Sequence, residues 1–154
     1  MDFLKKIIQN GKLELVQPSE EIKLSYIQKS ESHLLSAKIL LQNNLLEESV
    51  SMAYYSMYHM LIALLFRTGI KCENHTASIQ LLKEIFNLNN EEILFAKKER
   101  IDKQYYIDFN ITKEETSQMI EKADIFNKEL LDFIDKLNTQ KIKEYRERFE
   151  KELK

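Results

Sequence analysis

The chain has 154 residues, enough for one domain with its own core. Its net charge of −2 excludes a chain-wide attraction to nucleic acid or membrane, and its single cysteine, Cys72, excludes an internal disulfide. Two glycines, one proline and 31% charged residues suit a helical protein. With neither an apolar leader nor an apolar run long enough to span a bilayer, we expect a cytoplasmic protein without a membrane segment.

The chain opens with a short element and then a long one. Residues 1–18 predict a short amphipathic helix, with Phe3 and Ile7, followed by an extended connector that ends at Pro18. A long helix is predicted from about Ser19 to Gln42. Its inward face, at helical spacing, comprises Ile22, Tyr26, His33, Ala37, Leu40 and Leu41.

The next helix, Leu45 to Arg67, is predicted to be the most buried element. No formal charge lies between Glu48 and Arg67. A helix that is apolar nearly all round is typical of the centre of a fold rather than its surface. Gly69 is a natural C-terminal stop for this helix.

Three further helices are expected. Short helices over about His75–Phe86 and Glu91–Tyr106 precede a long one that begins at the capping box of Thr112 and Glu115. The inward positions of that long helix are Met119, Ala123, Phe126, Leu130, Phe133, Ile134 and Leu137. The charged residues 138–154 predict an exposed helical extension with i,i+4 ion pairs.

The expected fold is therefore all-α, an antiparallel bundle of about five helices with no strand-like alternation. It forms one domain with a core over about 19–137, an arm over 1–18 and an extension over 138–154. The pattern does not favour a metal: no histidine follows a glutamate by three residues, as in di-iron bundles, and there is no CxxC or HExxH motif. We expect neither a metal nor a cofactor.

Polar groups interrupt the apolar central helix in the string AYYSMYHM, residues 53–60. Tyr55 and His59 lie one turn apart, and Tyr54 and Tyr58 form the neighbouring row. Each aromatic body could fill the core while its polar tip finds a carbonyl or water, the interpretation favoured for any one residue alone. Alternatively, this face forms the floor of a polar pocket.

A second polar group is ERIDKQYY, residues 99–106. An arginine can clamp a phosphate with two hydrogen bonds, and a tyrosine can stack on a base or donate a hydrogen bond. Composition and spacing alone favour the alternative, an exposed Arg100 in an ordinary charged helix with packed tyrosines. His75, at a helix start, is by itself typical of a surface or capping residue.

Together, these pieces resemble the HEPN family (higher eukaryotes and prokaryotes nucleotide-binding domain) over roughly residues 10–137. The similarity is to its small stand-alone prokaryotic branch, whose central helix carries an Ala-Tyr-Tyr-Ala-Met-Phe-His-like string, as in residues 53–59. His75 fits the histidine that starts the following helix. Arg100 and Tyr105 fit the Arg-x4-Tyr that precedes an acidic, capped last helix.

The resemblance implies a five-helix bundle, commonly a homodimer whose arginine motifs face each other across a shared cleft. Many relatives are metal-independent ribonuclease toxins, encoded beside a minimal nucleotidyltransferase that acts as antitoxin. Their motif is Arg, four to six residues, then His. Here the histidine positions hold Tyr105, Tyr106 and Ile107. A tyrosine, with a pKa of about 10, is a poor general base at neutral pH, so Arg100 carries over but the catalytic histidine does not.

We therefore expect one concave, locally basic site, completed by a second protomer. Its residues are Arg100, Tyr105, Tyr106, Tyr55, His59 and His75, with Lys97, Lys98 and Lys103 adding positive potential. Tyr105 and Tyr106 are also candidate acceptors of a nucleotide attached by such a nucleotidyltransferase.

The expected function is that of a nucleotide- or RNA-binding subunit, the toxin-like partner of a minimal nucleotidyltransferase, that cleaves RNA slowly or not at all. One alternative is an active metal-independent endoribonuclease toxin in which His59 or His75 replaces the motif histidine. Another is a helical interaction module without a ligand.

Overall fold

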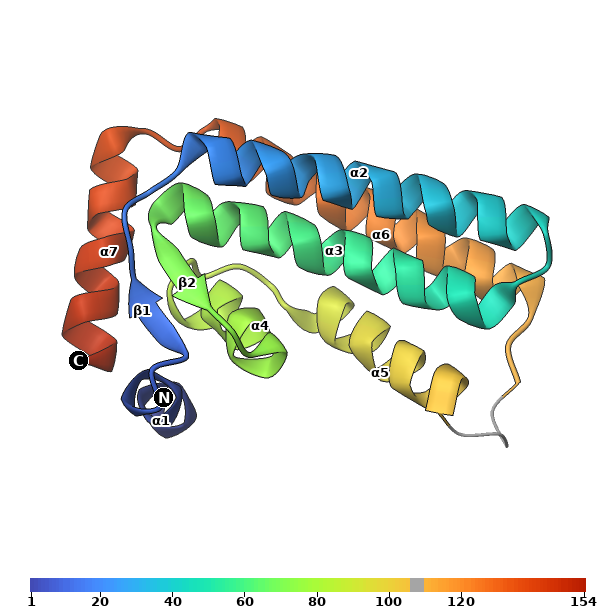
Figure 1. The fold of residues 1–154 in the computed structure, drawn as a ribbon, viewed down its shortest axis with the longest axis horizontal. Helices are drawn as coiled ribbons and strands as arrows, with labels where there is room; N and C mark the ends of the chain where they lie inside the picture. Colours follow the sequence, from blue (N-terminus) through green and yellow to red (C-terminus); the bar gives the residue numbers. More distant parts are fainter. Residues whose placement is uncertain (106–109) are drawn as a thin grey trace.

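The computed structural model describes residues 1–105 and 110–154, with residues 102–105 described by their backbone alone. The described chain forms seven α-helices and one small sheet, which confirms the predicted all-α class (Figure 1). The elements in order are α1 (Asp2–Gln9), β1 (Leu13–Leu15), α2 (Glu20–Gln42), α3 (Leu46–Thr68), β2 (Ile70–Cys72), α4 (His75–Glu84), α5 (Glu91–Tyr105), α6 (Lys113–Asp135) and α7 (Thr139–Leu153).

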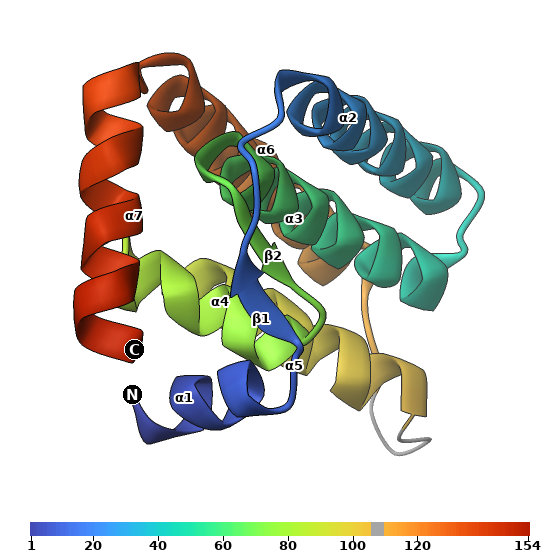
Figure 2. The ribbon, with the colours of Figure 1, turned by 60° about the vertical axis from the view of Figure 1, so that its left-hand side comes forward.

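Helix α3 lies at the centre of the bundle. Helices α2 and α6 run along two of its sides, and α4 and α5 cover another (Figures 1 and 2). Ala53, Met57, Leu61 and Leu64 are fully buried, so the prediction that this helix is the most buried element is confirmed. Within the described residues, α3 alone is long and apolar enough to cross a membrane, and 78% of its most apolar window is buried inside the protein. Packing in the bundle thus accounts for its apolarity.

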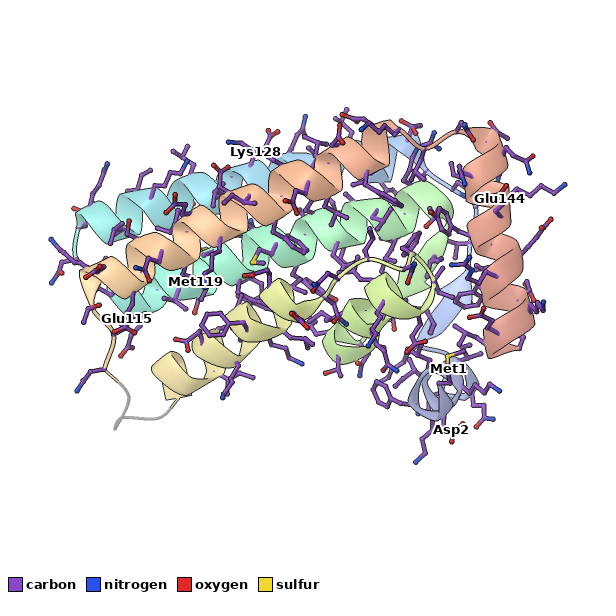
Figure 3. The ribbon with its side chains drawn as sticks, turned by 180° about the vertical axis from the view of Figure 1, so that it is seen from behind. Met1, Asp2, Glu115, Met119, Lys128 and Glu144 are labelled. Atoms are coloured by element: carbon purple, nitrogen blue, oxygen red, sulfur yellow. The ribbon has the colours of Figure 1, made fainter. Side chains whose placement is uncertain are left out.

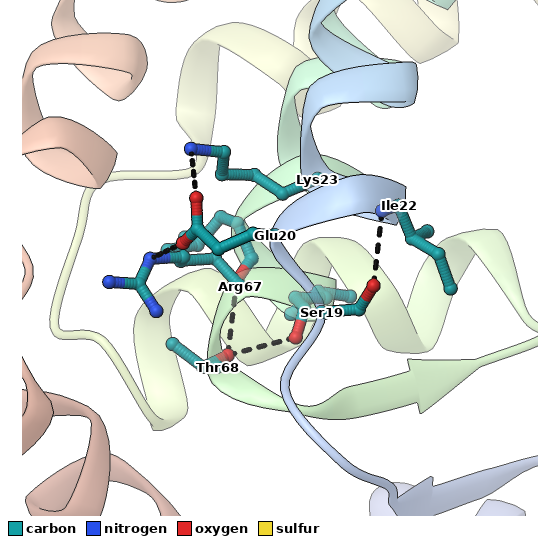
Figure 4. A network of polar contacts seen from close by, with 8 residues as sticks. Ser19, Glu20, Ile22, Lys23, Arg67 and Thr68 are labelled. Carbon is teal, nitrogen blue, oxygen red and sulfur yellow. Dashed lines mark hydrogen bonds and ion pairs between the residues drawn. The ribbon is translucent and has the colours of Figure 1, made fainter.

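The start of α2 is bonded to the end of α3. Ser19 caps α2, because its Oγ accepts a hydrogen bond from the Ile22 backbone N–H (3.1 Å). Glu20 forms ion pairs with Arg67 (2.6 Å) at the end of α3 and with Lys23 (2.9 Å) one turn ahead (Figure 4). These contacts fix where the chain enters the long antiparallel pair of α2 and α3.

The inward faces of the long helices are only partly as predicted. Helix α2 packs on α3 through Ile27, Ser30, Leu34 and Ala37, while the predicted inward residue Ile22 is 39% exposed. Helix α6 is closer to expectation, with Met119 buried and Lys128 pointing outwards (Figure 3). Apolar residues lie on both sides of α2, so spacing alone could not identify its buried stripe.

Two three-residue strands were not predicted. β1 and β2 pair antiparallel, with Leu13 opposite Cys72 and Leu15 opposite Ile70. The sequence indicated an extended connector and a loop at these places. Strands this short show no alternation that separates them from a loop, and their pairing joins segments far apart in the sequence.

Helix α7 forms as predicted, but it is not an exposed extension. Ile142, Phe149 and Leu153 are buried, and the Tyr145 ring packs against the rings of Phe86 (4.9 Å) and Phe133 (6.1 Å). These apolar residues recur at helical spacing. Because most of the residues between them are charged, they were not identified from the sequence alone as a buried face.

Two arginines of α7 bond to backbone carbonyls of other elements. Arg146 Nη1 donates to the carbonyls of Val16 (2.8 Å), Thr68 (3.0 Å) and Gly69 (2.9 Å). Arg148 Nη1 donates to the carbonyl of Ile85 (2.8 Å). Gly69 has a φ of +76°, and a Cβ there would overlap Arg146 Nη1 and the Val16 carbonyl. The arginines therefore anchor α7 rather than solvate it.

Candidate functional site

A pocket of about 500 Å³ opens where α2 turns into α3. Its size falls within the range of small-molecule sites. It is lined by Ser36, Ile39 and Leu40 of α2, Glu48, Ser51, Met52 and Tyr55 of α3, and Arg100 of α5. A larger groove of about 820 Å³ runs along α7, but its lining includes neither histidine nor tyrosine. The pocket at Arg100 combines an arginine, a tyrosine and a carboxylate in its lining.

The Arg100 side chain lies across the tyrosine rows of α3. Its Cζ is 5.0 Å from the centre of the Tyr55 ring and 5.7 Å from that of Tyr54. Both distances are within the range of cation–π interactions. Because α5 packs along α3, the guanidinium is held on aromatic faces at the edge of the pocket.

Tyr54 connects this arginine to the start of α4. The Tyr54 hydroxyl shares a hydrogen bond with His75 Nδ1 (3.0 Å), and the His75 ring stacks on Tyr58 (3.8 Å between centroids). Burial raises the pKa of Tyr54 above its ordinary value and that of Tyr58 to about 12, so both keep their phenolic protons. Burial first, then Lys97 and Arg100, lowers the pKa of His75, which favours its neutral form.

Lys97 adds a second cation one turn before Arg100 on α5. Its Nζ donates to the Thr76 hydroxyl (2.6 Å) in the first turn of α4. Burial first, then Arg100, lowers the pKa of Lys97. Two cations therefore lie near His75.

His59 lies behind Tyr55 rather than in the pocket. Its ring is 6.3 Å from that of Tyr55 and 4.7 Å from that of His33. His33 Nδ1 donates to the Lys29 carbonyl (2.6 Å), whereas His59 Nδ1 is buried with no hydrogen-bond partner among the described residues. Burial first, followed by the charge of His33, lowers the pKa of His59 to about 4. At neutral pH this imidazole is uncharged.

Other polar groups of the same stretch belong to the core. Ser56 Oγ donates to the Ala53 carbonyl (2.7 Å) and accepts from Asn127 Nδ2 (3.1 Å), and the Ser30 hydroxyl donates to the Ser56 carbonyl (2.6 Å). Tyr58 also lies within hydrogen-bonding distance of Ser78 (3.4 Å). Both interpretations of AYYSMYHM therefore apply, each to different residues.

The structure brings together three of the predicted site residues, Arg100, Tyr55 and His75, while His59 reaches them through Tyr55. Lys98 is exposed. The side chains of Lys103 and Tyr105, and all of Tyr106, lie outside the described residues, so the predictions placed on them stay predictions. No group of three metal-binding side chains occurs in the described parts of the chain.

Sequence reasoning missed Glu48, Ser51 and Met52. They share one face of α3 with Tyr55, at positions i, i+3, i+4 and i+7. That spacing was visible in the sequence. The contribution of α2 to the opposite wall was not, because it depends on how the two helices pack.

The fold is an all-α helical bundle, and comparison with known proteins gives its family. The family model described as "HEPN domain" matches residues 24–136. The chain therefore belongs to the HEPN-domain family, and the resemblance seen in the sequence is confirmed.

Two relatives come from archaea. Over 114 residues the chain is 31% identical to a Methanocaldococcus jannaschii protein named "Putative toxin MJ0605". The aligned region covers 70% of this chain and 84% of that protein. Over 62 residues it is 42% identical to the UPF0332 protein PH1297 of Pyrococcus horikoshii. This second match spans 40% of the chain and 43% of the relative, less than half of each.

Proposed function

We propose that this chain is a toxin-like HEPN subunit that binds a nucleotide or RNA through Arg100. The observation that carries the proposal is the position of the Arg100 guanidinium, 5.0 Å from the Tyr55 ring at the edge of a pocket of about 500 Å³. An arginine offers a permanent charge with a fork of donors that fits phosphate oxygens. Tyr55 offers the aromatic face on which an unpaired base can stack.

The neighbouring groups favour an anion at the same place. Lys97 lies one turn from Arg100, and both cations lower the pKa of His75. A bound phosphate would offset the mutual repulsion of these positive groups. We therefore place the phosphate between α5 and the start of α4, with the base towards the pocket.

Cleavage of RNA is expected to be slow or absent. The positions at which relatives carry the catalytic histidine hold Tyr105, Tyr106 and Ile107. A protonated tyrosine hydroxyl does not take a proton from a 2′-hydroxyl at neutral pH.

A second candidate function, a metal-independent endoribonuclease, is favoured by one observation. His75 Nδ1 is held by the Tyr54 hydroxyl (3.0 Å), an arrangement that fixes an imidazole and leaves its other nitrogen to exchange a proton. Its lowered pKa keeps this imidazole neutral at pH 7, the protonation state in which a general base starts.

We also propose that the chain acts as a homodimer in the cytoplasm and pairs with a minimal nucleotidyltransferase as antitoxin. Leu24, Leu35 and Ile39 lie on one face of α2 and are 52%, 58% and 49% exposed. A second copy would cover this stripe and complete the neighbouring pocket. The toxin name of the Methanocaldococcus relative supports a toxin-like role.

Binding is tested by titrating the wild type, Arg100→Ala and the control Lys98→Ala with a short RNA and with 5′ nucleotides. Lys98 is exposed on α5 and does not line the pocket, so it matches the loss of charge without the contact. We expect Arg100→Ala to weaken binding about tenfold or more and Lys98→Ala about twofold. Equal binding by the wild type and Arg100→Ala would exclude Arg100 from the site.

Cleavage is tested on the same RNA without metal, with wild type and His75→Asn. We expect little product from either. Robust cleavage by the wild type that His75→Asn abolishes would establish the ribonuclease instead. If RNA and nucleotides neither bind nor react, the remaining alternative, an interaction module without a ligand, is correct.

A further inference from the structure

We infer that the pocket selects guanine, with Glu48 as the residue that reads the base. The inference rests on the proposed function, because it assumes that a nucleotide binds at Arg100. It adds the class of base and names the side chain that distinguishes it from the other three.

Glu48 and Arg100 lie at opposite ends of the pocket lining. Glu48 is in the first turn of α3, and Arg100 lies over Tyr55, two helical turns further along. A helix rises about 1.5 Å per residue, so Glu48 and Tyr55 begin about 10 Å apart. A nucleotide, with its phosphate at one end and the base edge at the other, can span this separation.

The charges of the two ends fix the direction of binding. Arg100 attracts the phosphate, and the Glu48 carboxylate repels it. The phosphate therefore lies at the α5 end, and the outer edge of the base faces the start of α3.

The Glu48 carboxylate is available to a ligand. It has no hydrogen-bond or ion-pair partner among the described residues, although it lines the pocket. Its neighbours in the lining, Ile39, Leu40 and Met52, are apolar. Glu48 itself is exposed in the free protein, so a base bound against these apolar side chains would shield its hydrogen bonds to the carboxylate from water.

An ionised carboxylate only accepts hydrogen bonds, and it has two oxygens with which to do so. Guanine presents two adjacent donors on its Watson–Crick edge, the N1–H and the N2 amino group. Adenine and cytosine present one amino donor beside an acceptor nitrogen, and uracil presents one N–H between two carbonyls. Only guanine can form two parallel bonds with Glu48 without setting an acceptor against it.

The experiment titrates the wild type with the 5′-monophosphates of guanosine, adenosine, cytidine and uridine. We expect guanosine monophosphate to bind about tenfold more tightly than the others, the effect of one charge-assisted hydrogen bond. Glu48→Gln should remove this preference. It should weaken the binding of guanosine monophosphate about tenfold, because a glutamine amide sets a donor against a guanine donor. The affinity for adenosine monophosphate should be unchanged or slightly higher.

Glu47→Gln is the matched control. Glu47 is exposed in the same helical turn and carries the same charge, but it does not line the pocket. This variant should change the affinity for all four nucleotides by the same small factor, about twofold or less.

Three outcomes separate this inference from the proposed function. If Glu48→Gln tightens all four nucleotides equally, Glu48 is only a repulsive charge and the inference is wrong. If all four bind the wild type equally and all depend on Arg100, the inference is wrong while the proposed function stands. If no mononucleotide binds but the short RNA does, only the inference is wrong, and if neither binds, both fail.

Discussion

Two arginines of this protein lie in opposite surroundings, and the proposed role of each follows from them. Arg146, on α7, directs one nitrogen at three backbone carbonyls that belong to three different residues. Arg100, on α5, lies across the faces of Tyr54 and Tyr55 beside a pocket. Hydrogen bonds to carbonyls commit the donors of a guanidinium to the fold. Stacking contacts a guanidinium through its face.

The largest effect on stability is expected at the first of these arginines. Arg146→Ala would leave the carbonyls of Val16, Thr68 and Gly69 without this charged donor. We expect a loss of about 3 kcal/mol in the free energy of unfolding. Urea unfolding followed by circular dichroism measures it.

Lys143→Ala is the control for that experiment, because Lys143 is an exposed cation on the same helix. It should change the free energy of unfolding by less than about 0.5 kcal/mol. A similar loss for both variants would show that the carbonyl contacts of Arg146 contribute little.

The second prediction concerns pH and the aromatic cluster behind the pocket. The pKa of His59 is lowered to about 4 in the folded chain, below the ordinary 6.5. Between these values the unfolded chain binds more protons, so the free energy of unfolding falls as the pH drops from about 6.5 towards 4. This group contributes no change above that window. Since the ring is partly exposed, we expect a loss of about 1 kcal/mol.

Comparison of the wild type with His59→Phe, by urea unfolding at pH 7.5 and pH 4.5, isolates this contribution. The variant should lose less stability on acidification. Parallel pH profiles for the two proteins would mean that His59 is not the group responsible.

A smaller effect on stability is expected at Tyr54, which contacts both Arg100 and His75. Tyr54→Phe removes the hydroxyl bonded to His75 (3.0 Å) but keeps the ring beneath Arg100. We expect a loss of about 1 kcal/mol in stability, the net value of one hydrogen bond, and nucleotide affinity within about twofold of the wild type. A large loss of affinity would instead place the Tyr54–His75 pair in contact with the ligand.

For Arg100→Ala we expect a smaller loss of stability than for Arg146→Ala, to which the cation–π contacts with Tyr54 and Tyr55 contribute about 0.5–1 kcal/mol. Thermal unfolding of the free protein measures it. Taken with the loss of nucleotide affinity proposed above, this result would make Arg100 the converse of Arg146. A destabilisation as large as that of Arg146→Ala would show that Arg100 also serves the fold.

The sequence allowed the central helix and the capping box to be predicted, because both depend on neighbours along the chain. Helix α3 is uncharged from Ser49 to Phe66, a pattern typical of a buried helix. The Thr112 hydroxyl accepts from the Glu115 backbone N–H (3.1 Å), as the spacing of the two residues indicated.

The docking of α7 and the small sheet could not be predicted in the same way. Helix α7 is highly charged and has only three buried apolar residues, Ile142, Phe149 and Leu153. From the sequence alone such a helix is predicted to be exposed to solvent, because the surface that it packs against is not known. The candidate site, like the fold, was only partly predictable from the sequence. Arg100, Tyr55 and His75 stood out by residue type, whereas the role of Glu48 depends on α2 forming the opposite wall.

The attachment of α7 through carbonyl oxygens has a consequence for how this protein tolerates sequence drift. Every residue carries a carbonyl, so Arg146 would bond equally well to other side-chain types at Val16 and Thr68, provided that the backbone path is kept. Gly69 is restricted, because a side chain there would occupy the space of the guanidinium, and Thr68 is restricted by its own full burial. Substitutions at the partly exposed Val16 should therefore leave the contact with Arg146 intact, while inserting one residue between α3 and β2 would move the carbonyls away from the arginine and release the helix.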